Sequence, residues 1–297
     1  IWVVDKAELP TFPSKPNKKR TLMLAVVLGL FGGVGLAFLI EYLDNTVKSE
    51  AELEKRFGRT VLGSVEKIAK KESIESYIVK HPLSPLAESY RLIRSGLLLS
   101  SADQPPGTIL VTSMEQSEGK TSVAINVARV LAQDQKKVLI IDCDLRRPRM
   151  HKLFKLDNQS GLSSYLSGNI DRVALDEIVD EPLSVITSGP VPPNPSELLS
   201  SKRMQTLLAE MDEAFDFVLL DSPPVQSVTD SLALASAASG TIVVVHYGKT
   251  TYDTLAGGMK KLNDVNAQVL GFVINGLKAS EAGSGYYGYS GYYKKYT

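Results

Sequence analysis

The longest apolar stretch of the chain is residues 21–40, in which twenty successive residues carry no charge. At 1.5 Å of rise per residue, about twenty apolar residues cross the roughly 30 Å hydrocarbon core of a bilayer. Charges bracket the stretch closely, which disfavours the alternative of a buried helix in a soluble domain. Its length, and the lack of a small-residue cleavage site, disfavour a signal peptide. The pattern predicts one transmembrane helix.

Beyond this stretch, short apolar runs alternate with segments of helical periodicity. Apolar residues recur at helical spacing over 86–99, and a second helix is expected from about 119 to 134. Short apolar runs separated by helices are typical of a parallel sheet that is covered on both faces. The predicted strands are 108–112, 138–142, 183–187, 217–221, 241–246 and 268–275. We therefore predict an α/β fold.

The segment between the apolar helix and the predicted sheet is rich in charge. It is expected to contain a helix in which Ser49 is the N-cap and Glu52 completes a capping box. The expected organisation is an extracytoplasmic juxtamembrane segment (1–20), the transmembrane helix (21–40), a cytoplasmic linker (41–80), a globular domain (81–280) and a tyrosine-rich tail (281–297). The chain starts at Ile1 and not at Met, so we expect a fragment of a longer protein.

Composition narrows the functional classes. Of 297 residues, 33 are Lys or Arg and 33 are Asp or Glu, so the formal net charge of zero gives no indication of a nucleic-acid partner. With 43% hydrophobic and 22% charged residues, the chain can build a packed core. Cys143 is the single cysteine, which excludes a disulfide or a multi-cysteine metal site within one chain.

A predicted strand, a loop and a predicted helix surround the sequence SMEQSEGKTS at 113–122. This order is that of a P-loop, in which backbone N–H groups at a helix N-terminus cradle phosphates. Lys120 would neutralise the β and γ oxygens, and the Thr121 hydroxyl would ligate Mg²⁺. The standard pattern has glycine where Met114 stands, and the alternative is an ordinary strand-to-helix turn. The expected nucleotide-binding residues are Ser117, Glu118, Gly119, Lys120, Thr121 and Ser122.

Three aspartates extend this expected site. Asp142 and Asp144 follow the second predicted strand, and Asp221 ends the strand at 217–221. The carboxyl ends of parallel strands form the ligand crevice of such sheets, so all three carboxylates are expected near the phosphates. Mg²⁺ needs only one or two carboxylates besides phosphate oxygens, which leaves one carboxylate free to act as a base. The predicted fold is a P-loop NTPase-type parallel sheet flanked by helices and preceded by one transmembrane helix.

These motifs resemble those of the bacterial tyrosine kinases (BY-kinases) of the polysaccharide co-polymerase type. The family usually has glycine at the position of Ser117, whereas partition-type ATPases would have lysine at the position of Glu115. The matching segments are EGKTS (118–122, Walker A), IIDCDLRRP (140–148, Walker A′), VLLDSPP (218–224, Walker B), PPNPSELL (192–199) and PSKPNKKR (13–20).

The resemblance implies an inner-membrane autokinase that uses ATP and Mg²⁺ and phosphorylates a C-terminal tyrosine cluster in trans. It also implies control of capsule or exopolysaccharide export, with the polymerase and export machinery and a cognate protein tyrosine phosphatase as partners. Glycine and serine between the tail tyrosines predict a flexible backbone, although an interaction tail without phosphate chemistry is the alternative. The expected phosphoacceptors are Tyr286, Tyr287, Tyr289, Tyr292, Tyr293 and Tyr296.

The resemblance also implies roles within the site, which residue spacing alone does not distinguish. The expected catalytic residues are Lys120, Asp142, which would activate the tyrosine hydroxyl, and Asp144, which would coordinate the metal. Asp221 would act through the water shell of the metal, so the expected metal ligands are Thr121, Asp144 and Asp221. Asn275 closes the last predicted strand, where related ATPases contact adenine.

Two further groups of charged residues leave alternatives open. Arg146, Arg147 and Arg149 are expected either to contact phosphate or the tail, or to form a solvated basic loop. The residues Glu88, Arg91 and Arg94 match the family's E-x-x-R-x-x-R oligomerisation motif, which implies a homo-oligomeric ring, often an octamer. The alternative for this second group is a Glu88–Arg91 pair on a solvated helix face.

The orientation of the predicted membrane helix is in conflict with one rule. Lys and Arg residues at 15–20 precede the helix, and the positive-inside rule alone would place them in the cytoplasm. We overrule it because an ATP-using domain must be cytoplasmic, which predicts a bacterial inner-membrane protein with a cytoplasmic kinase domain. The competing hypotheses are a partition-type P-loop ATPase that acts as a nucleotide-dependent switch, and a membrane scaffold whose nucleotide site has lost activity.

Overall fold

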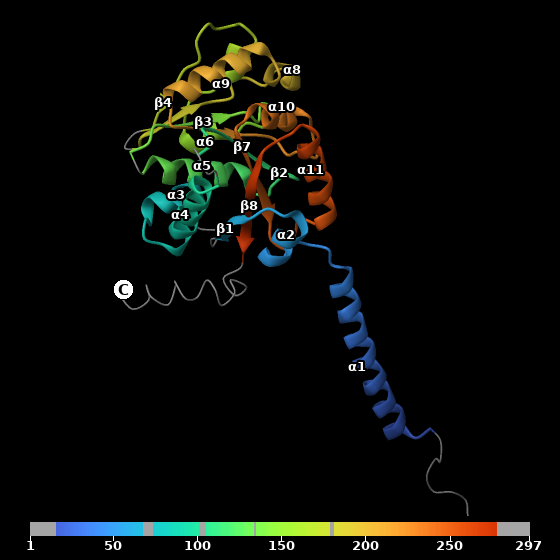
Figure 1. Cartoon of the computed structure of the whole chain (residues 1–297). Helices are drawn as coiled ribbons and strands as arrows, with labels where there is room; N and C mark the ends of the chain where they lie inside the picture. The colour runs from blue at the N-terminus through green and yellow to red at the C-terminus, as the bar shows by residue number, and fades with distance from the viewer. Residues whose placement is uncertain (1–15, 68–73, 101–104, 134, 179–180, 278–297) are drawn as a thin grey trace, which may run out of the picture. The chain divides into compact units, whose positions relative to one another are not determined.

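The computed structural model of the chain describes residues 16–67, 74–100, 105–133, 135–178 and 181–277 (Figure 1). The chain divides into two compact units, one ending at Asn45 and the other starting at Thr46. The six tail tyrosines that we expect to be phosphoacceptors lie outside the described residues.

The first unit consists of one helix, α1 (Lys18–Leu43), which the Asn17 side chain caps by accepting a hydrogen bond from the Arg20 N–H at 3.2 Å. Its most apolar window has a mean hydropathy of 2.5, and none of its residues is buried. Within the described part of the chain, α1 is the one helix that is long and apolar enough to cross a membrane. The helix expected over 21–40 is therefore present, three residues longer at each end.

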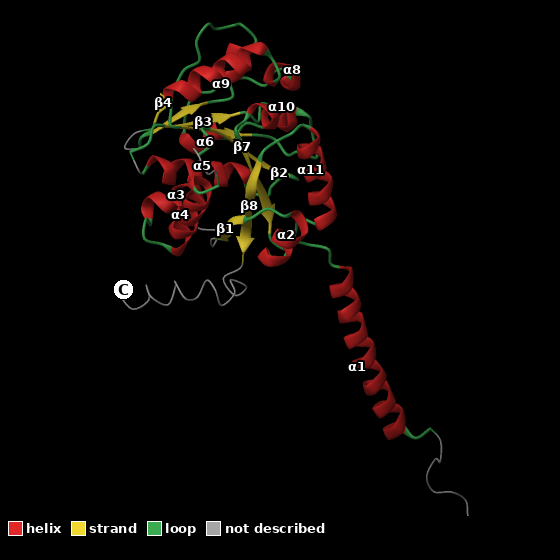
Figure 2. Ribbon diagram, in the orientation of Figure 1, coloured by secondary structure: helices red, strands yellow, loops and turns green. Residues whose placement is uncertain are grey.

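The second unit is built on one sheet, which in the described residues has eight strands in the order β1-β8-β7-β2-β6-β3-β5-β4 (Figure 2). All neighbouring strands are parallel except β4 and β5. The strands are β1 (Val61–Glu66), β2 (Thr108–Ser113), β3 (Val138–Asp142), β4 (Asp176–Glu177), β5 (Leu183–Ile186), β6 (Phe217–Asp221), β7 (Gly240–His246) and β8 (Val269–Leu277). The six predicted strands and the predicted parallel fold are confirmed.

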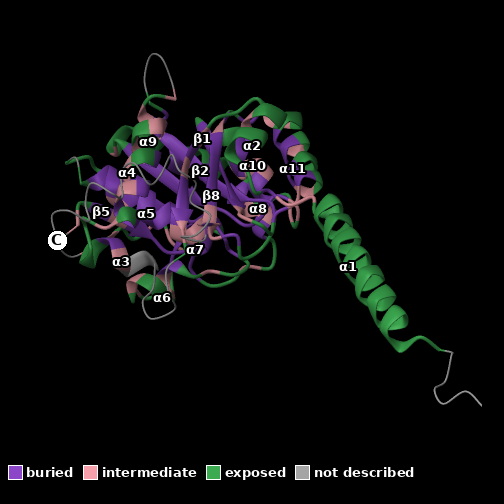
Figure 3. Ribbon diagram, turned by 90° about the horizontal axis from the view of Figure 1, so that it is seen from below, coloured by how far each residue is buried: buried purple, intermediate pink, exposed green. Residues whose placement is uncertain are grey.

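Helices cover both faces of the sheet, whose central strands are buried (Figure 3). Successive strand residues alternate between two apolar cores: in β3, Leu139 and Ile141 join one core while Val138 and Ile140 join the other, which is why the strands carry apolar residues on both faces. Helices α3 (Ile74–Lys80), α4 (Pro85–Leu98) and α5 (Lys120–Ala132) contribute to one core, and α2 (Glu50–Phe57), α9 (Lys202–Ala214), α10 (Asp230–Ala237) and α11 (Tyr252–Asp264) contribute to the other. Three short helices, α6 (Met150–Phe154), α7 (Leu162–Leu166) and α8 (Pro195–Leu199), complete the unit.

Part of the segment 41–80, which we expected to be a linker, belongs to the globular unit. Thr46 bridges to Thr251, α2 follows the predicted Ser49 cap, and β1 forms an edge of the sheet beside β8. Gly63 lets α4 pass close to β1, since a Cβ at this position would lie 2.7 Å from Ile93 Cγ1. Residues 46–66 thus belong to the globular unit and connect it directly to the chain that follows α1.

Candidate active site

The candidate site lies where the carboxyl ends of the central strands meet. In the sheet, β2 lies between β7 and β6. The chain runs from β2 to β3 on the side of β6 and later from β6 to β7 on the other side, so the strand order reverses at β2. Open parallel sheets bind their ligands at such a point. A cavity of about 340 Å³ opens here. Its lining residues are Gln116, Ser117, Gly119, Lys120, Thr121, Ser122, Asp144, Arg146, Arg147, Arg149, Pro223, Pro224, Ser227 and Val228.

The loop between β2 and α5, residues 114–119, depends on two residues with positive φ. Ser117 has φ 64° and Gly119 has φ 94°. The left-handed conformation at 117 gives a physical reason for the glycine that the related family has there. A Cβ at Gly119 would lie 2.0 Å from Asn275 Nδ2, so this position needs glycine for space as well as for conformation.

Met114 departs from the glycine of the standard P-loop pattern, and α11 accommodates it. The Met114 side chain is fully buried beneath the loop. Gly258 of α11 faces it so closely that a Cβ there would lie 1.8 Å from the Met114 sulfur. The Met114 side chain thus occupies space that is free only because residue 258 has no side chain.

Glu118 holds the loop together from inside and does not line the cavity. It is 1% exposed, its carboxylate accepts the Glu115 N–H at 2.8 Å, and the Thr250 hydroxyl donates to its other oxygen. Burial raises the pKa of this carboxyl group, although these hydrogen bonds oppose the shift. The Asn275 amide donates to the Glu118 carbonyl oxygen at 2.8 Å, so Asn275 also contacts the loop.

Lys120 and Asp144 form an ion pair inside the cavity, with 3.1 Å between Nζ and Oδ2. Burial alone would lower the pKa of Lys120, but the nearby carboxylates of Asp221 and Asp144 outweigh it and raise the pKa. Lys120 therefore remains a cation at neutral pH. The topology thus brings together two predicted site residues that lie 24 positions apart in the sequence.

Asp142 ends β3 and is fully buried beside Asp221, its register partner on β6. Its Oδ2 accepts the N–H groups of Arg149 and Met150 at 3.2 and 3.1 Å, and its Oδ1 accepts the Asp144 N–H at 3.3 Å. Burial, followed by the negative charge of Asp221, raises the pKa of Asp142 to about 7. The side chain fixes the path of residues 144–150 and is poised to hold or release a proton near neutral pH.

Asp221 has an oxygen that could receive a metal ion. Burial raises the pKa of this carboxyl group to about 6, although Lys120 and a hydrogen bond from the Thr121 hydroxyl oppose the shift. Its Oδ1 is buried and has no hydrogen-bond partner in the described residues. No group of three or more His, Cys, Asp or Glu side chains in that part of the chain could hold a metal by itself. Thr121, Asp144 and Asp221 therefore suit Mg²⁺, which takes few carboxylates and completes its shell with phosphate and water.

Arg146 takes part in a network that the sequence did not indicate. Its guanidinium contacts both oxygens of the buried Asp230 carboxylate, at 2.8 and 3.1 Å. The Ser196 hydroxyl donates to the same carboxylate, and hydrogen bonding from Arg146 and Ser196 outweighs burial and lowers the pKa of Asp230. The network ties the loop after β3 to α8 and α10, while the Arg146 side chain stays 41% exposed.

The residues of the expected oligomerisation motif lie on α4 and have partners within the chain. Glu88 and Arg91 form an ion pair of 2.9 Å, and Arg91 also donates to the Pro82 carbonyl oxygen at 2.5 Å. Arg94 donates to the Val130 carbonyl oxygen of α5 at 3.0 Å. Within one chain, the motif therefore stabilises α4 and its packing on α5, and its role between chains stays a prediction.

Known proteins resemble this chain in sequence and in fold. Residues 108–269 match a family described as an AAA domain. The chain is 40% identical over 212 residues to the tyrosine-protein kinase YwqD of Bacillus subtilis (strain 168), which covers 70% of this chain and 88% of that protein. It is 34% identical over 294 residues to the tyrosine-protein kinase ptk of Acinetobacter johnsonii, which covers 95% of this chain and 40% of that protein. The chain thus spans less than half the length of this second relative.

A solved structure agrees with these sequence matches. The kinase domain of the Escherichia coli tyrosine kinase ETK superposes with a TM-score of 0.73 at 29% identity, and the match covers 78% of this chain and 96% of that domain. The motifs, the fold and the relatives point to the same group of proteins. The chain belongs to the family of bacterial tyrosine-protein kinases.

Proposed function

We propose that the chain is the catalytic part of a membrane-anchored protein tyrosine kinase that phosphorylates its own C-terminal tyrosines in trans. The observation that carries the proposal is the Lys120–Asp144 pair, with 3.1 Å between the charged atoms, in a cavity that Thr121 also lines. Phosphoryl transfer requires mainly positioning and charge stabilisation, and a lysine, a hydroxyl and carboxylates at a helix N-terminus supply both.

Each residue has a role in the proposal. Lys120 and the N–H groups of the loop bind the phosphates of ATP. Thr121, Asp144 and Asp221 hold Mg²⁺, which neutralises charge on the β- and γ-phosphates. Asp142 accepts the proton of the tyrosine hydroxyl, and its pKa of about 7 suits such a base. Asn275 offers its amide oxygen to adenine, because its amide nitrogen already donates to Glu118.

The remaining parts of the proposal concern the environment of the kinase. α1 anchors the chain in the bacterial inner membrane with the second unit in the cytoplasm. Copies assemble into a ring through the α4 motif, and each tail enters the site of a neighbour. A cognate phosphatase reverses the modification, and the partner machinery polymerises and exports a capsular or extracellular polysaccharide. The family resemblance supports these assignments.

The test is phosphotyrosine formation by the purified chain in detergent with Mg-ATP. Wild-type chain should accumulate phosphotyrosine in residues 286–296, and Lys120→Met should lower the rate by about a hundredfold or more, as expected for a lost transition-state charge contact. Lys260→Met, an exposed lysine on α11, is the matched control and should keep the wild-type rate.

Mixing two chains tests the direction of transfer. An active chain that lacks residues 281–297 should label the tail of the Lys120→Met chain, and the absence of label would show transfer in cis. ATP hydrolysis without any phosphotyrosine in the wild-type chain would overturn the kinase proposal and favour the partition-type ATPase.

A further inference from the structure

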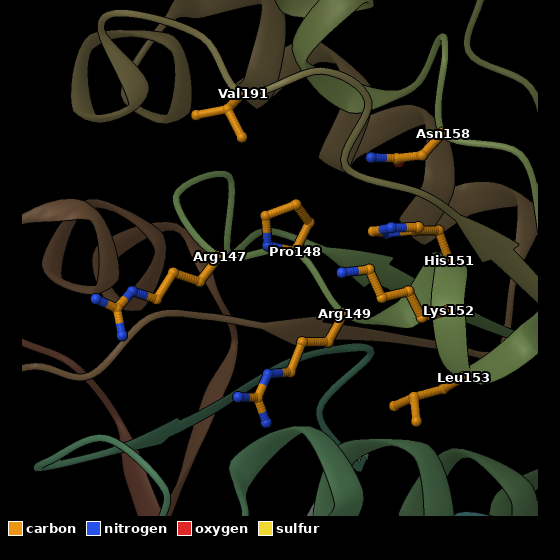
Figure 4. A pocket seen from close by; sticks show the side chains of 8 residues that line it. All are labelled: Arg147, Pro148, Arg149, His151, Lys152, Leu153, Asn158 and Val191. Atoms are coloured by element: carbon orange, nitrogen blue, oxygen red, sulfur yellow. The ribbon is translucent and has the colours of Figure 1, made fainter.

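A second, larger cavity of about 610 Å³ lies beside the candidate active site (Figure 4). Arg147 and Arg149 line both cavities, so the two adjoin each other. The roles proposed above do not use the larger one, which we call the basic pocket. Its lining residues are Arg147, Pro148, Arg149, His151, Lys152, Leu153, Asn158 and Val191.

The basic pocket concentrates positive charge, which the buried Asp221 carboxylate offsets in part at Arg149. None of its eight lining residues is acidic. The adjacent Arg146 is paired with Asp230, but in the described part of the chain no carboxylate lies within ion-pair distance of Arg149 or Lys152. Arg147 donates to the neutral Gln116 amide oxygen at 2.8 Å. Unpaired guanidinium and ammonium groups are the usual ligands of phosphate.

The pocket also has an apolar wall. Leu153 and Val191 are 39% and 62% exposed, and Pro148 lies between the two arginines. In Figure 4 the side chains of His151, Lys152 and Asn158 lie side by side and point toward Pro148. The Nδ1 atom of His151 is buried and has no hydrogen-bond partner in the described residues. Cations beside exposed apolar groups suit a ligand that carries a phosphate on an aromatic ring better than they suit a free phosphate ion.

We propose that the basic pocket binds a phosphotyrosine of the C-terminal tail and thereby primes phosphorylation of the next tyrosine. This inference rests on the proposed function, since that activity supplies the phosphotyrosine. Neighbouring tail tyrosines are one to three residues apart. An extended chain spans at most about 3.6 Å per residue, so a docked phosphotyrosine holds the Cα of the next tyrosine within roughly 11 Å of its own Cα. Because the two cavities share Arg147 and Arg149, the next tyrosine stays close to the active site.

Each primed step is the same reaction as the first. The γ-phosphoryl group of ATP passes to a tyrosine oxygen, the phenolic proton is lost, and ADP leaves. Docking adds only proximity, because the tail does not diffuse away between steps. The tail is therefore expected to acquire several phosphates in one encounter, so that doubly phosphorylated tails accumulate while unmodified tails are still abundant.

A binding measurement without turnover tests the pocket. The whole Lys120→Met chain in detergent, with Mg²⁺ and a non-hydrolysable ATP analogue, is titrated into a fluorescent peptide of residues 283–297 that carries phosphate on Tyr292. The phosphopeptide should bind at least about tenfold more tightly than the unmodified peptide, the effect of one good charge-assisted contact. Adding Lys152→Gln should remove most of this difference, whereas Lys155→Gln, an exposed lysine at the end of α6 that does not line the pocket, should preserve it.

Three results would overturn the proposal. Equal binding of the two peptides would show that the pocket does not recognise phosphate. Equal losses in Lys152→Gln and Lys155→Gln would reduce the effect to general charge attraction. Tighter phosphopeptide binding in a parallel titration without the ATP analogue would place the phosphopeptide in the loop at residues 114–119 and not in the basic pocket. Since no phosphate is transferred in this experiment, its failure is distinct from failure of the proposed kinase activity.

Discussion

Two segments border the candidate active site, and they differ in what their charged side chains do. In the phosphate loop, residues 114–119, the Glu118 carboxylate is used up in hydrogen bonds inside the loop and to Thr250, and Asn275 bonds the loop from β8. In the segment that follows β3, Asp142 fixes the backbone, but Arg149 and Lys152 are exposed and have no carboxylate within ion-pair distance in the described chain. Both backbones are fixed before any ligand binds, and only the second segment keeps charged side chains available.

The difference indicates what each segment has to recognise. A nucleotide always presents the same phosphates, so a fixed loop loses little conformational entropy when it binds them. A tail with several tyrosines presents its charge at varying positions, and long side chains can follow it.

Gly119→Ala should have the largest effect. The new Cβ would clash with the Asn275 amide, 2.0 Å away, and the residue would have to adopt a φ of 94°. We expect ATP affinity to fall by well over about tenfold, together with a lower melting temperature. Gly58→Ala is the matched control, since it also has a positive φ but open space around it, and it should cost only about 1–2 kcal/mol. ATP binding by calorimetry and thermal unfolding measure both effects, and equal behaviour of the two variants would contradict the role of Asn275.

The buried carboxyl pair should make stability of the nucleotide-free chain fall as pH rises. Burial raises the pKa of Asp142 to about 7 and that of Asp221 to about 6, above the ordinary value of 3.8. Between pH 4 and 7 the folded chain therefore binds more protons than the unfolded chain. The free energy of unfolding should then fall with pH, by up to about 1.4 kcal/mol per unit for each proton.

Asp142→Asn should flatten this slope, because the amide does not titrate. Denaturant unfolding at several pH values measures the slope separately from any constant loss of stability. An unchanged slope in the variant would show that Asp142 ionises normally in the folded chain.

Thr250→Val should remove a hydrogen bond that holds the phosphate loop, while the side chain at position 250 keeps its size and shape. The isosteric substitution leaves the buried Glu118 carboxylate with one hydrogen bond fewer and the His246 N–H without its acceptor, which should cost about 1–3 kcal/mol of stability and weaken ATP binding. The control is Thr206→Val at an exposed position of α9, where the hydroxyl donates to a carbonyl of its own helix, and it should cost under about 0.5 kcal/mol. Equal losses would contradict the idea that Thr250 acts on the loop.

Ser117→Gly should raise stability by up to about 1 kcal/mol, since glycine adopts the φ of 64° at no steric cost. Urea unfolding measures the change. A clear loss of stability would mean that the Ser117 side chain makes a contribution that outweighs its conformational strain.

The smallest change is expected in the basic segment. Lys152→Gln should alter the free energy of unfolding by less than about 0.5 kcal/mol, as is usual for exposed side chains without close partners. A larger loss would show that this lysine stabilises the fold, and the contrast between the two segments would then disappear.

Sequence patterns predicted most of the sheet because its inner strands are buried on both faces and therefore contain short continuous apolar runs. The edge strand β1 escaped detection, since its six residues include Gly63 and Ser64 and only a few apolar positions. Its identity as a strand depends on pairing with β8, which lies more than two hundred residues later in the chain. A short edge strand whose position is set by tertiary contacts is therefore hard to recognise from its own sequence.

The site shows the same limit. Lys120, Asp144 and Asp221 could be grouped because Asp144 and Asp221 lie at or just beyond strand ends and Lys120 opens the helix that follows a strand. The Thr250 hydroxyl on Glu118 and the Asp230 carboxylate on Arg146 join residues that are 132 and 84 positions apart, and no local pattern marks them. Glu118 belongs to a recognisable motif, but its side chain is buried inside the loop and does not line the cavity. The close fit of Met114 against Gly258 likewise cannot be predicted without knowing how α11 packs.

The short connection between α1 and the globular unit determines where the kinase can work. α1 ends at Leu43, and Val47 is already fixed by hydrogen bonds with Thr250 and Gly248. Four residue steps span at most roughly 14 Å. If α1 crosses a bilayer, as proposed, each globular unit is tethered and cannot diffuse away from its membrane. Encounters between copies would then depend on the number of chains per area of membrane, and diluting the membranes in bulk solution would leave the rate of phosphorylation unchanged.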